Sequence, residues 1–208
     1  MRYVSIDTET TALKPQEGGI LSFGAVIEDT NKSLPLDELP RFHVYVKQEE
    51  PIQGSYFALQ MNHEILKAIA TKDTSIPIVN KYDVKESFHK FLIDNGFEAN
   101  EKGRITITAA GKNFAGFDKP FINCMFVKDK VRFRQRTMDP TMLYFDSSLD
   151  EVLPDLKTCK ERAGIKGEVT HDALDDALDV VAVLRKKYKQ KEENKNFLSK
   201  AWHKYLVD

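Results

Sequence analysis

The sequence predicts an α/β protein in which a mixed β-sheet is flanked by helices. Two observations support this prediction. Residues 3–46 contain three segments with the alternation or the apolar content of strands, whereas residues 51–190 alternate between helical spacing and short β-branched runs. Strands first, followed by alternating helices and strands, are typical of an antiparallel three-stranded meander to which parallel strands are added.

The three N-terminal segments are expected to form the meander. From Tyr3 to Glu9 the side chains alternate with the period of a strand, which places Asp7 and Glu9 on one face. Residues 20–27 are a second apolar run, and residues 42–46 alternate again. The connection between these two segments is longer than a tight hairpin turn, so we interpret it as an added loop.

Helical spacing dominates the rest of the chain. We expect two helices between residues 51 and 96, a strand over 105–109, a helix over 119–127, a short strand over 132–138, and helices over 153–163 and 172–190. Pro120 suits the first turn of the helix that starts near residue 119. Asp118, just before that turn, is a candidate N-cap.

The charge balance excludes a protein covered by positive charge. The 208 residues include 31 Lys or Arg and 32 Asp or Glu, so nucleic acid must be contacted through a local basic patch or bound metal ions. The length and the hydrophobic content of 41% fit a single domain, residues 1–208.

A charged and aromatic segment starts at about residue 190. We interpret it as a solvated helix end with docked aromatics, and a basic flank for nucleic acid is the alternative.

The sequence also bears on location. The two cysteines, Cys124 and Cys159, lie in expected helices, which disfavours a disulfide framework. Asp7 stands where a signal peptide needs apolar residues, and no run of about 18 apolar residues occurs. We therefore expect a cytoplasmic protein with no membrane association.

Carboxylates at three places are candidate functional groups. Asp7 and Glu9 point together from the end of the first strand, and two such carboxylates repel unless a cation such as Mg²⁺ or Mn²⁺ lies between them. Asp118 lies at a strand-to-helix loop, so a ligand role is an alternative to capping. On the last helix, Asp176 falls within the apolar arc, which requires a partner or a metal.

The neighbours of Asp176 are interpreted differently. Asp175 and Asp179 fall on the opposite side of the helical wheel and are expected to form a polar face. His171 fits near the carboxylates only if it precedes the helix, with Asp172 or Thr170 as the cap. A loop histidine in that place can take a proton from water.

Together these segments resemble the DEDDh branch of the DnaQ-like 3′→5′ exonuclease superfamily, which includes polymerase proofreading subunits, oligoribonuclease and RNase T. The first motif corresponds to Ile6-Asp7-Thr8-Glu9-Thr10-Thr11, the second to Asn113, Phe117, Asp118 and Phe121, and the third to His171, Ala173, Asp176 and Ala177. The resemblance covers nearly the whole chain. Ala12 departs from the pattern, because many relatives have Gly there, and Met61-Asn62-His63 departs from a His-Gly form, so we assign that stretch no role.

The resemblance implies a ribonuclease-H-like fold and a two-metal hydrolase. Asp7, Glu9, Asp118 and Asp176 would hold two Mg²⁺ or Mn²⁺ ions, and His171 would deprotonate the attacking water. Thr10, Leu13 and Asn113 would contact the terminal nucleotide, while Phe114 and Phe117 are expected mainly to pack. The implied substrate is the 3′ end of single-stranded DNA or RNA.

Two other functions stay open. One is a non-catalytic nucleic-acid-binding or assembly module with an exonuclease fold, and the other is a hydrolase limited to short oligonucleotides or to the 3′ ends of structured RNA. No sequence pattern reports a preference for DNA or RNA, since that depends on the environment of the 2′-hydroxyl. A polymerase or other protein partner would be a separate chain.

Overall fold

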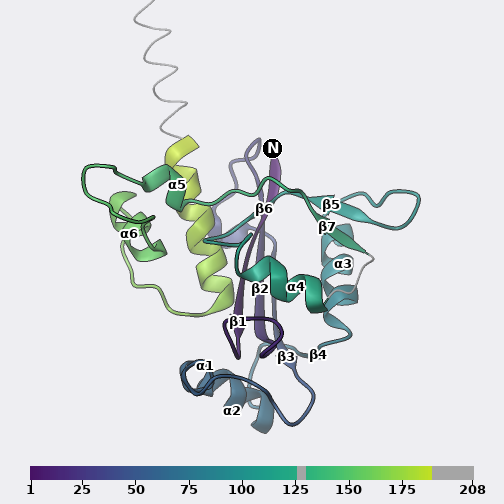
Figure 1. The fold of residues 1–208 in the computed structure, drawn as a ribbon. Coiled ribbons are helices and arrows are strands. Elements are labelled where there is room, and N and C mark those ends of the chain that lie inside the picture. The colour runs from purple at the N-terminus through teal and green to yellow at the C-terminus, as the bar shows by residue number, and fades with distance from the viewer. Residues whose placement is uncertain (126–129, 189–208) are drawn as a thin grey trace, which may run out of the picture.

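The computed structural model describes residues 1–125 and 130–188, which form a central sheet with helices on both faces (Figure 1). The sheet has five strands in the order β4-β3-β2-β1-β6. Their bounds are β1 Arg2–Thr10, β2 Ile20–Asp29, β3 Arg41–Lys47, β4 Ile78–Asn80 and β6 Ala109–Ala110. The expected antiparallel meander of β1, β2 and β3 is confirmed, and β6 and β4 extend it as parallel strands beside β1 and β3.

The expected single strand over residues 105–109 is wrong, because the run divides between two sheets. β5 (Ile105–Ile107) pairs in parallel with β7 (Val131–Phe133), whereas β6 pairs with β1. The strand expected over 132–138 divides in the same way, since after β7 only an isolated bridge joins Met138 to Ala110. The chain therefore leaves a small peripheral sheet and enters the main one at about residue 108.

The helices also differ in part from the expected ones. They are α1 Tyr56–Met61, α2 His63–Thr71, α3 Val84–Asp94, α4 Asp118–Met125, α5 Thr141–Tyr144 and α6 Leu156–Arg162, followed by a helix over residues 173–188, here called the C-terminal helix. Residues 51–96 contain three helices and the short strand β4 rather than two helices, and Asn62 is both the C-cap of α1 and the N-cap of α2. The short α5 and the 3₁₀ turn Leu36–Glu38 were not expected from the sequence.

Each face of the main sheet carries its own hydrophobic core. On one face, Ile6 and Phe23 pack with Phe88 of α3 and Ile122 of α4. On the other, Tyr3 and Val26 pack with α6 and with the C-terminal helix, which contributes Val180 and Leu184, among others. Figure 1 shows these two groups of helices on opposite sides of β1 and β2. β1, between β2 and β6, is therefore covered on both faces, and its end opens between the two helical layers.

The C-terminal helix lies very close to the sheet at Gly24 of β2. A Cβ atom at Gly24 would lie 2.2 Å from the carbonyl carbon and oxygen of Ala173, far inside contact distance. Gly24 is the cross-strand partner of Asp7. The missing side chain therefore lets the start of this helix lie directly over the end of β1.

Three further expectations concern location and the chain end. Both cysteines are free, Cys124 exposed and Cys159 buried. Within residues 1–125 and 130–188, no helix combines the length and apolar character needed to cross a membrane. The charged and aromatic segment expected from about residue 190 lies outside the described residues.

Candidate active site

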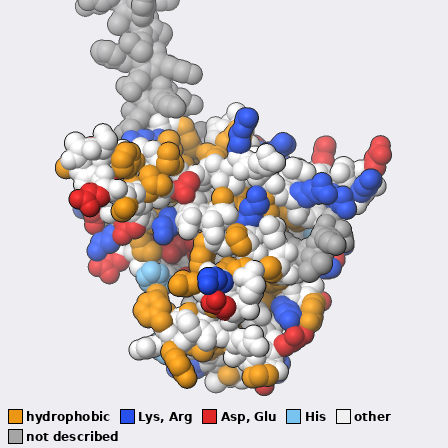
Figure 2. All heavy atoms as spheres, viewed as in Figure 1, with side chains coloured by type: hydrophobic (Ala, Val, Ile, Leu, Met, Phe, Trp, Pro, Cys, Tyr) orange, Lys and Arg blue, Asp and Glu red, His pale blue; other side chains and the backbone are white. Residues whose placement is uncertain are grey.

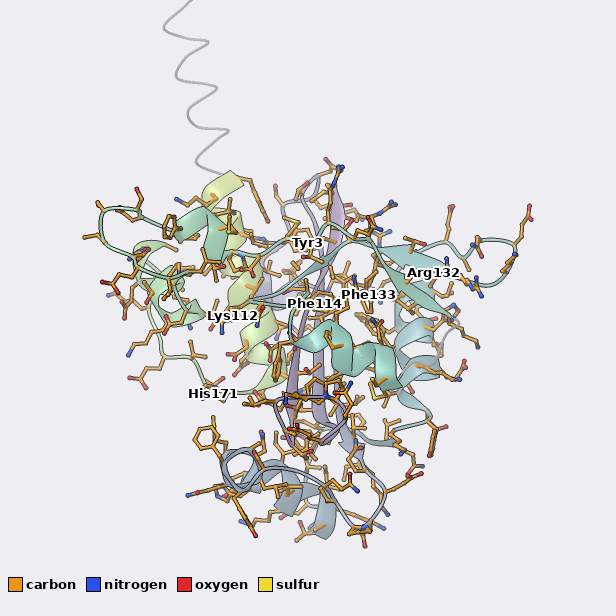
Figure 3. All side chains as sticks on the ribbon, in the orientation of Figure 1. Tyr3, Lys112, Phe114, Arg132, Phe133 and His171 are labelled. Atoms are coloured by element: carbon orange, nitrogen blue, oxygen red, sulfur yellow. The ribbon has the colours of Figure 1, made fainter. Side chains whose placement is uncertain are left out.

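A cleft of about 580 Å³ opens where β1 ends. Its lining includes seven of the eight residues that the sequence singled out: Asp7, Glu9, Leu13, Asn113, Asp118, His171 and Asp176. Figure 3 labels His171 and Lys112, which line the cleft from the segments before the C-terminal helix and before α4. Residues separated by more than 160 positions are thus brought to one place by the sheet.

The β1 side of the cleft carries Asp7 and Glu9. They lie two residues apart on one strand and therefore share a face, as the alternation predicted. Thr8 points to the opposite face, where its hydroxyl donates a hydrogen bond of 2.7 Å to Oδ1 of Asp118. The strand thus presents two carboxylates itself and orients a third.

Asp118 is the first residue of α4 and is only 2% exposed. The expected position before the helix is therefore wrong, because Asp118 lies within α4, where its carboxylate accepts from Thr8 and is close enough to Asp7 to raise the pKa of that carboxyl. A buried carboxylate in this position needs hydrogen bonds or cations to remain ionised.

The other side of the cleft is built by the start of the C-terminal helix. Asp176 is 7% exposed, which confirms the prediction that it points inward, and its Oδ1 has no hydrogen-bond partner among the described residues. His171 precedes the helix, as expected, and is exposed with φ of 54°. Asp172 caps the helix, since its Oδ1 accepts hydrogen bonds from the amides of Leu174 (2.9 Å) and Asp175 (3.1 Å). The cap therefore places His171 immediately before the first turn of the helix.

One ligand atom from each of Glu9, His171 and Asp176 lies within 4.8 Å of the other two. These three residues come from β1 and from both sides of the helix start. Carboxylate oxygens and an imidazole nitrogen at this separation can share a divalent cation or a water molecule.

The carboxylates perturb one another strongly in the protein without metal. Burial, followed by repulsion from Asp118 and Asp176, holds the pKa of Asp7 well above its usual range. Burial likewise raises the pKa of Asp118, although hydrogen bonding from Thr8 opposes this. Burial and neighbouring carboxylates raise the pKa values of Glu9 and Asp176 to about 7. Each of these four groups is therefore harder to ionise than in water.

Divalent cations fit this donor set. Six acidic side chains line the cleft against two lysines, Lys112 and Lys157, both outside the buried carboxylate cluster. The unpartnered Oδ1 of Asp176 is a buried acceptor that lacks a donor or a cation. Clustered oxygen ligands with uncompensated negative charge are the environment that hard cations such as Mg²⁺ and Mn²⁺ prefer.

The three residues expected to contact substrate differ in their surroundings. Leu13 is 77% exposed at the cleft, and Asn113 is exposed with φ of 55° and an amide that donates to Oδ2 of Asp139 at 2.9 Å. Thr10, in contrast, is buried and is not part of the cleft lining, and its hydroxyl donates to the carbonyl oxygen of Ala12 at 2.8 Å. The Thr10 side chain is thus engaged within the protein.

The two phenylalanines that were expected to pack, Phe114 and Phe117, also lie in different environments. Phe114 is buried in the core, and its ring lies edge-on to that of Phe133 with centroids 5.2 Å apart (Figure 3). Phe117 is only partly buried and lines the cleft. Packing is therefore the role of Phe114, whereas the face of Phe117 is available to a ligand.

Asn62 was assigned no role from the sequence, yet it lies beside Glu9. Its buried amide nitrogen donates to the carbonyl oxygens of Thr10 and Ala58, both at 3.1 Å, and hydrogen bonding by its side chain lowers the pKa of Glu9. It therefore connects α1 to the end of β1 at the cleft. The sequence offered no signal for this role, because a boundary between two helices at Asn62 was not expected.

Lys160 is a second residue near the cleft that no sequence motif indicated. It is 4% exposed, and its ammonium group pairs with Asp179 and donates to the carbonyl oxygen of Glu168 at 3.1 Å. The prediction that Asp179 belongs to a simple polar face is thus wrong, because this carboxylate neutralises a buried lysine. A lysine four residues after the apolar Leu156 in an expected helix was the available signal.

Comparisons with known proteins agree with the fold. The model of a family described as exonuclease, RNase_T, matches residues 4–184. No curated protein sequence matches the chain significantly.

Solved structures of nucleases have similar architecture. Cell-death related nuclease 4 (CRN-4) superposes with a TM-score of 0.62 at 16% identity over 91% of this chain and 64% of that one. Escherichia coli exonuclease I in complex with a dT13 oligonucleotide gives 0.62 at 13% identity over 95% and 43% of the two chains. Exonuclease I from Methylocaldum szegediense gives 0.62 at 14% identity over 94% and 42%. The chain thus spans less than two thirds of each, and the likeness confirms the ribonuclease-H-like α/β fold.

Proposed function

The chain belongs to the RNase_T exonuclease family, and from this membership we propose that it is a metal-dependent 3′→5′ exonuclease acting on single-stranded DNA or RNA. The observation that carries the proposal is the convergence of four carboxylates and His171 in one cleft, with the buried Oδ1 of Asp176 unpartnered among the described residues. The motif order resembles that of the DEDDh enzymes, which supports the direction of attack.

Asp7, Glu9, Asp118 and Asp176 are the residues that would hold two divalent ions, Mg²⁺ or Mn²⁺. When bound, such ions would neutralise the negative charge of the phosphodiester and favour ionisation of the attacking water and departure of the leaving oxygen. The raised pKa values of the four carboxyls support this assignment, because the unmetallated cluster is electrostatically unfavourable.

His171 is proposed to accept the proton of the attacking water. It is exposed, it lies outside the helix, and its ring approaches Glu9 and Asp176, so it can reach a water that these carboxylates orient. Histidine is suited to this task because it exchanges a proton near neutral pH. The exposed setting lets the proton pass on to solvent after each cleavage.

Leu13, Asn113 and Phe117 are proposed to receive the 3′-terminal nucleotide, since all three line the same cleft. The exposed Leu13 side chain offers an apolar surface to a base, and Phe117 offers an aromatic one. Thr10 is left out of this set, because it does not line the cleft, its hydroxyl donates to Ala12 and its carbonyl oxygen accepts from Asn62.

A time course with 5′-labelled single-stranded DNA and RNA of matched sequence tests this function. Reactions contain Mg²⁺, Mn²⁺ or EDTA, with the Asp7→Asn variant and, as a matched acidic control, Asp73→Asn, whose side chain is exposed after α2. We expect a ladder shortening from the 3′ end, abolished by EDTA and slowed at least about 1,000-fold by Asp7→Asn, because a lost ligand removes several kcal/mol of transition-state stabilisation.

The same assay separates the other functions. A folded, metal-supplied protein that binds both strands but cleaves neither would contradict the proposal and favour a non-catalytic binding module. Cleavage of a dinucleotide with no cleavage of a long strand would instead identify a hydrolase limited to short oligonucleotides. Equal activity of Asp7→Asn and the wild type would refute the assigned site.

A further inference from the structure

The segment around β7 concentrates positive charge in an otherwise balanced chain. Residues 130–138 contain Lys130, Arg132, Arg134 and Arg136 and no acidic residue, although acids slightly outnumber bases over the whole sequence. Figure 2 shows Lys and Arg side chains gathered over the part of the molecule where β5 and β7 lie. This local excess is the kind of basic patch that the net charge alone does not reveal.

The three arginines of this segment face solvent. Phe133, the last residue of β7, packs against Phe114 of the core, so the side chain of Arg132 on the same strand projects to the opposite side. Arg134 follows the strand directly, and Arg136 lies in the bend after it. All three guanidinium groups belong to exposed residues. Lys130 pairs with Glu86, but over the described ranges no ion pair or hydrogen bond occupies the guanidinium of Arg132, Arg134 or Arg136.

Backbone hydrogen bonds connect this segment to the wall of the active-site cleft. The amide of Arg134 donates to Ile107 (2.9 Å), and the amide of Gly111 donates to Met138 (3.0 Å). Residues 131–139 thus run beside residues 105–113, and both stretches end where Lys112 and Asn113 line the cleft. Figure 3 shows Arg132 at the far end of this path and Lys112 at the cleft end.

The cleft is negatively charged, so a nucleic-acid strand needs a positively charged binding surface outside it. Its six acidic side chains repel a polyanion, and ions bound there would neutralise only the phosphate being cleaved. Phosphates further from the 3′ end need cations elsewhere. Guanidinium groups bind phosphate through two parallel hydrogen bonds, so three exposed arginines along one short segment can bind neighbouring phosphates of an extended strand.

We propose that Arg132, Arg134 and Arg136 bind the backbone phosphates of the single strand whose 3′ end lies in the cleft. The proposal rests on the proposed exonuclease function and adds where the rest of the substrate is held. Arg132 lies at the end of this path away from Lys112 and the cleft (Figure 3), so only substrates of several nucleotides reach it. Phosphate contacts of this kind carry no sequence preference and apply to DNA and RNA alike.

The test compares the triple variant Arg132→Gln, Arg134→Gln, Arg136→Gln with a control of equal charge change, Lys32→Gln, Lys72→Gln, Lys186→Gln, made at three other exposed positions. Binding of 5′-fluorescein-labelled oligothymidylate of about 20 nucleotides is measured by anisotropy in EDTA, where no cleavage occurs, over a range of salt concentrations. Thermal melts establish that both variants are folded.

We expect the arginine variant to bind at least about 10-fold more weakly and to lower the salt slope by about 2, since each single-strand phosphate contact contributes about 0.7. In steady-state assays, the ratio of kcat/KM for the long strand to kcat/KM for a dinucleotide should fall by a similar factor. The lysine control should retain wild-type values in both measurements.

Wild-type-like binding by the arginine variant, or equal weakening in the lysine control, would overturn the proposal. Failure of the exonuclease function is distinguishable, because it would appear as absence of cleavage by the wild type in Mg²⁺ and Mn²⁺, while the anisotropy measurement still decides whether the arginines bind the strand.

Discussion

Lys160 of α6 and Asp179 of the C-terminal helix form a buried ion pair that also holds the loop between them. The lysine donates a second hydrogen bond to the carbonyl oxygen of Glu168, three residues before His171. The pair therefore connects the helix that carries Asp176 to the loop that carries the proposed base. Its positive charge also lowers the pKa of Asp176, against the larger effect of burial.

Lys160→Met should lower both stability and kcat. Loss of one member of a buried pair leaves Asp179 uncompensated, and since this carboxylate is partly exposed we expect a cost of about 2 kcal/mol, or roughly 4–8 °C in Tm. We expect kcat to fall about 10-fold with little change in KM, because a misplaced His171 affects chemistry more than binding. The double variant with Asp179→Asn separates the two effects. Recovery of Tm without recovery of kcat supports a positioning role, whereas recovery of both indicates a structural one.

The carboxylate cluster predicts an unusual pH dependence of the metal-free protein. The pKa values of Glu9 and Asp176 rise from their ordinary values of 4.5 and 3.8 to about 7 in the fold. Between about pH 4 and pH 7 the folded protein therefore binds more protons than the unfolded chain, and its free energy of unfolding should fall as the pH rises through this window. Melting in EDTA at pH 5 and pH 8 measures this, and Asp176→Asn should reduce the slope. A Tm that rises steadily over the same range would contradict the assignment.

Adding Mg²⁺ should restore the stability that the metal-free protein loses as the pH rises. A cation bound by ionised carboxylates stabilises the folded state in proportion to its occupancy, so Mg²⁺ should raise Tm by several degrees at pH 8 and by much less at pH 5. Asp7→Asn should be more stable than the wild type in EDTA, because it removes one of the mutually repelling charges, and should respond little to Mg²⁺. The control Asp73→Asn should respond as the wild type does.

The hydrogen bond from Thr8 to Asp118 should influence metal affinity. Thr8→Val keeps the shape of the side chain but removes the hydroxyl that orients and stabilises the Asp118 carboxylate. Because partners of metal ligands typically contribute 10–100-fold to metal affinity, we expect the Mg²⁺ concentration for half-maximal activity to rise at least about 10-fold. Thr8→Ser retains a hydroxyl and should stay close to the wild type. Identical Mg²⁺ requirements for Val and Ser at this position would argue against the role.

Gly24→Ala should reduce activity while the sheet remains folded. The added methyl group would collide with the backbone of Ala173, so the start of the C-terminal helix must move away from β1. A displacement of about 1 Å can reduce catalysis about 100-fold, and we expect at least that loss in kcat/KM. Gly103→Asn is a control, because a Cβ there meets open space and asparagine tolerates the positive φ. Full activity of Gly24→Ala would refute the proposed close approach.

Local patterns were sufficient for much of the site. The alternation of β1 placed Asp7 and Glu9 on one face, and the helical wheel placed Asp176 inward, because side-chain direction follows directly from the period of an element. The position of His171 before its helix followed from the same geometry. These predictions depended on one element at a time.

What the sequence did not predict depends on contacts between distant elements. The run from Ile105 to Ala110 divides because its two ends find different partner strands, and no property of the run itself reports that choice. The pairing of Asp179 with Lys160 and the place of Asn62 beside Glu9 are likewise tertiary. A charged residue on a helical wheel was assigned to solvent because its buried partner lies on another helix.

Because the C-terminal helix packs against the sheet at Gly24, the complete cleft forms only when this helix is docked. Four of the five strands of the main sheet, including β1 with its two carboxylates, lie between Arg2 and Asn80, whereas His171 and Asp176 are placed only when the C-terminal helix packs on β2 and α6. Release of that one helix would leave the face built with α3 and α4 intact while separating His171 and Asp176 from the other proposed site residues. Enzymatic activity is therefore a reporter of the docking of the last helix, and inactivation can precede the melting of the sheet.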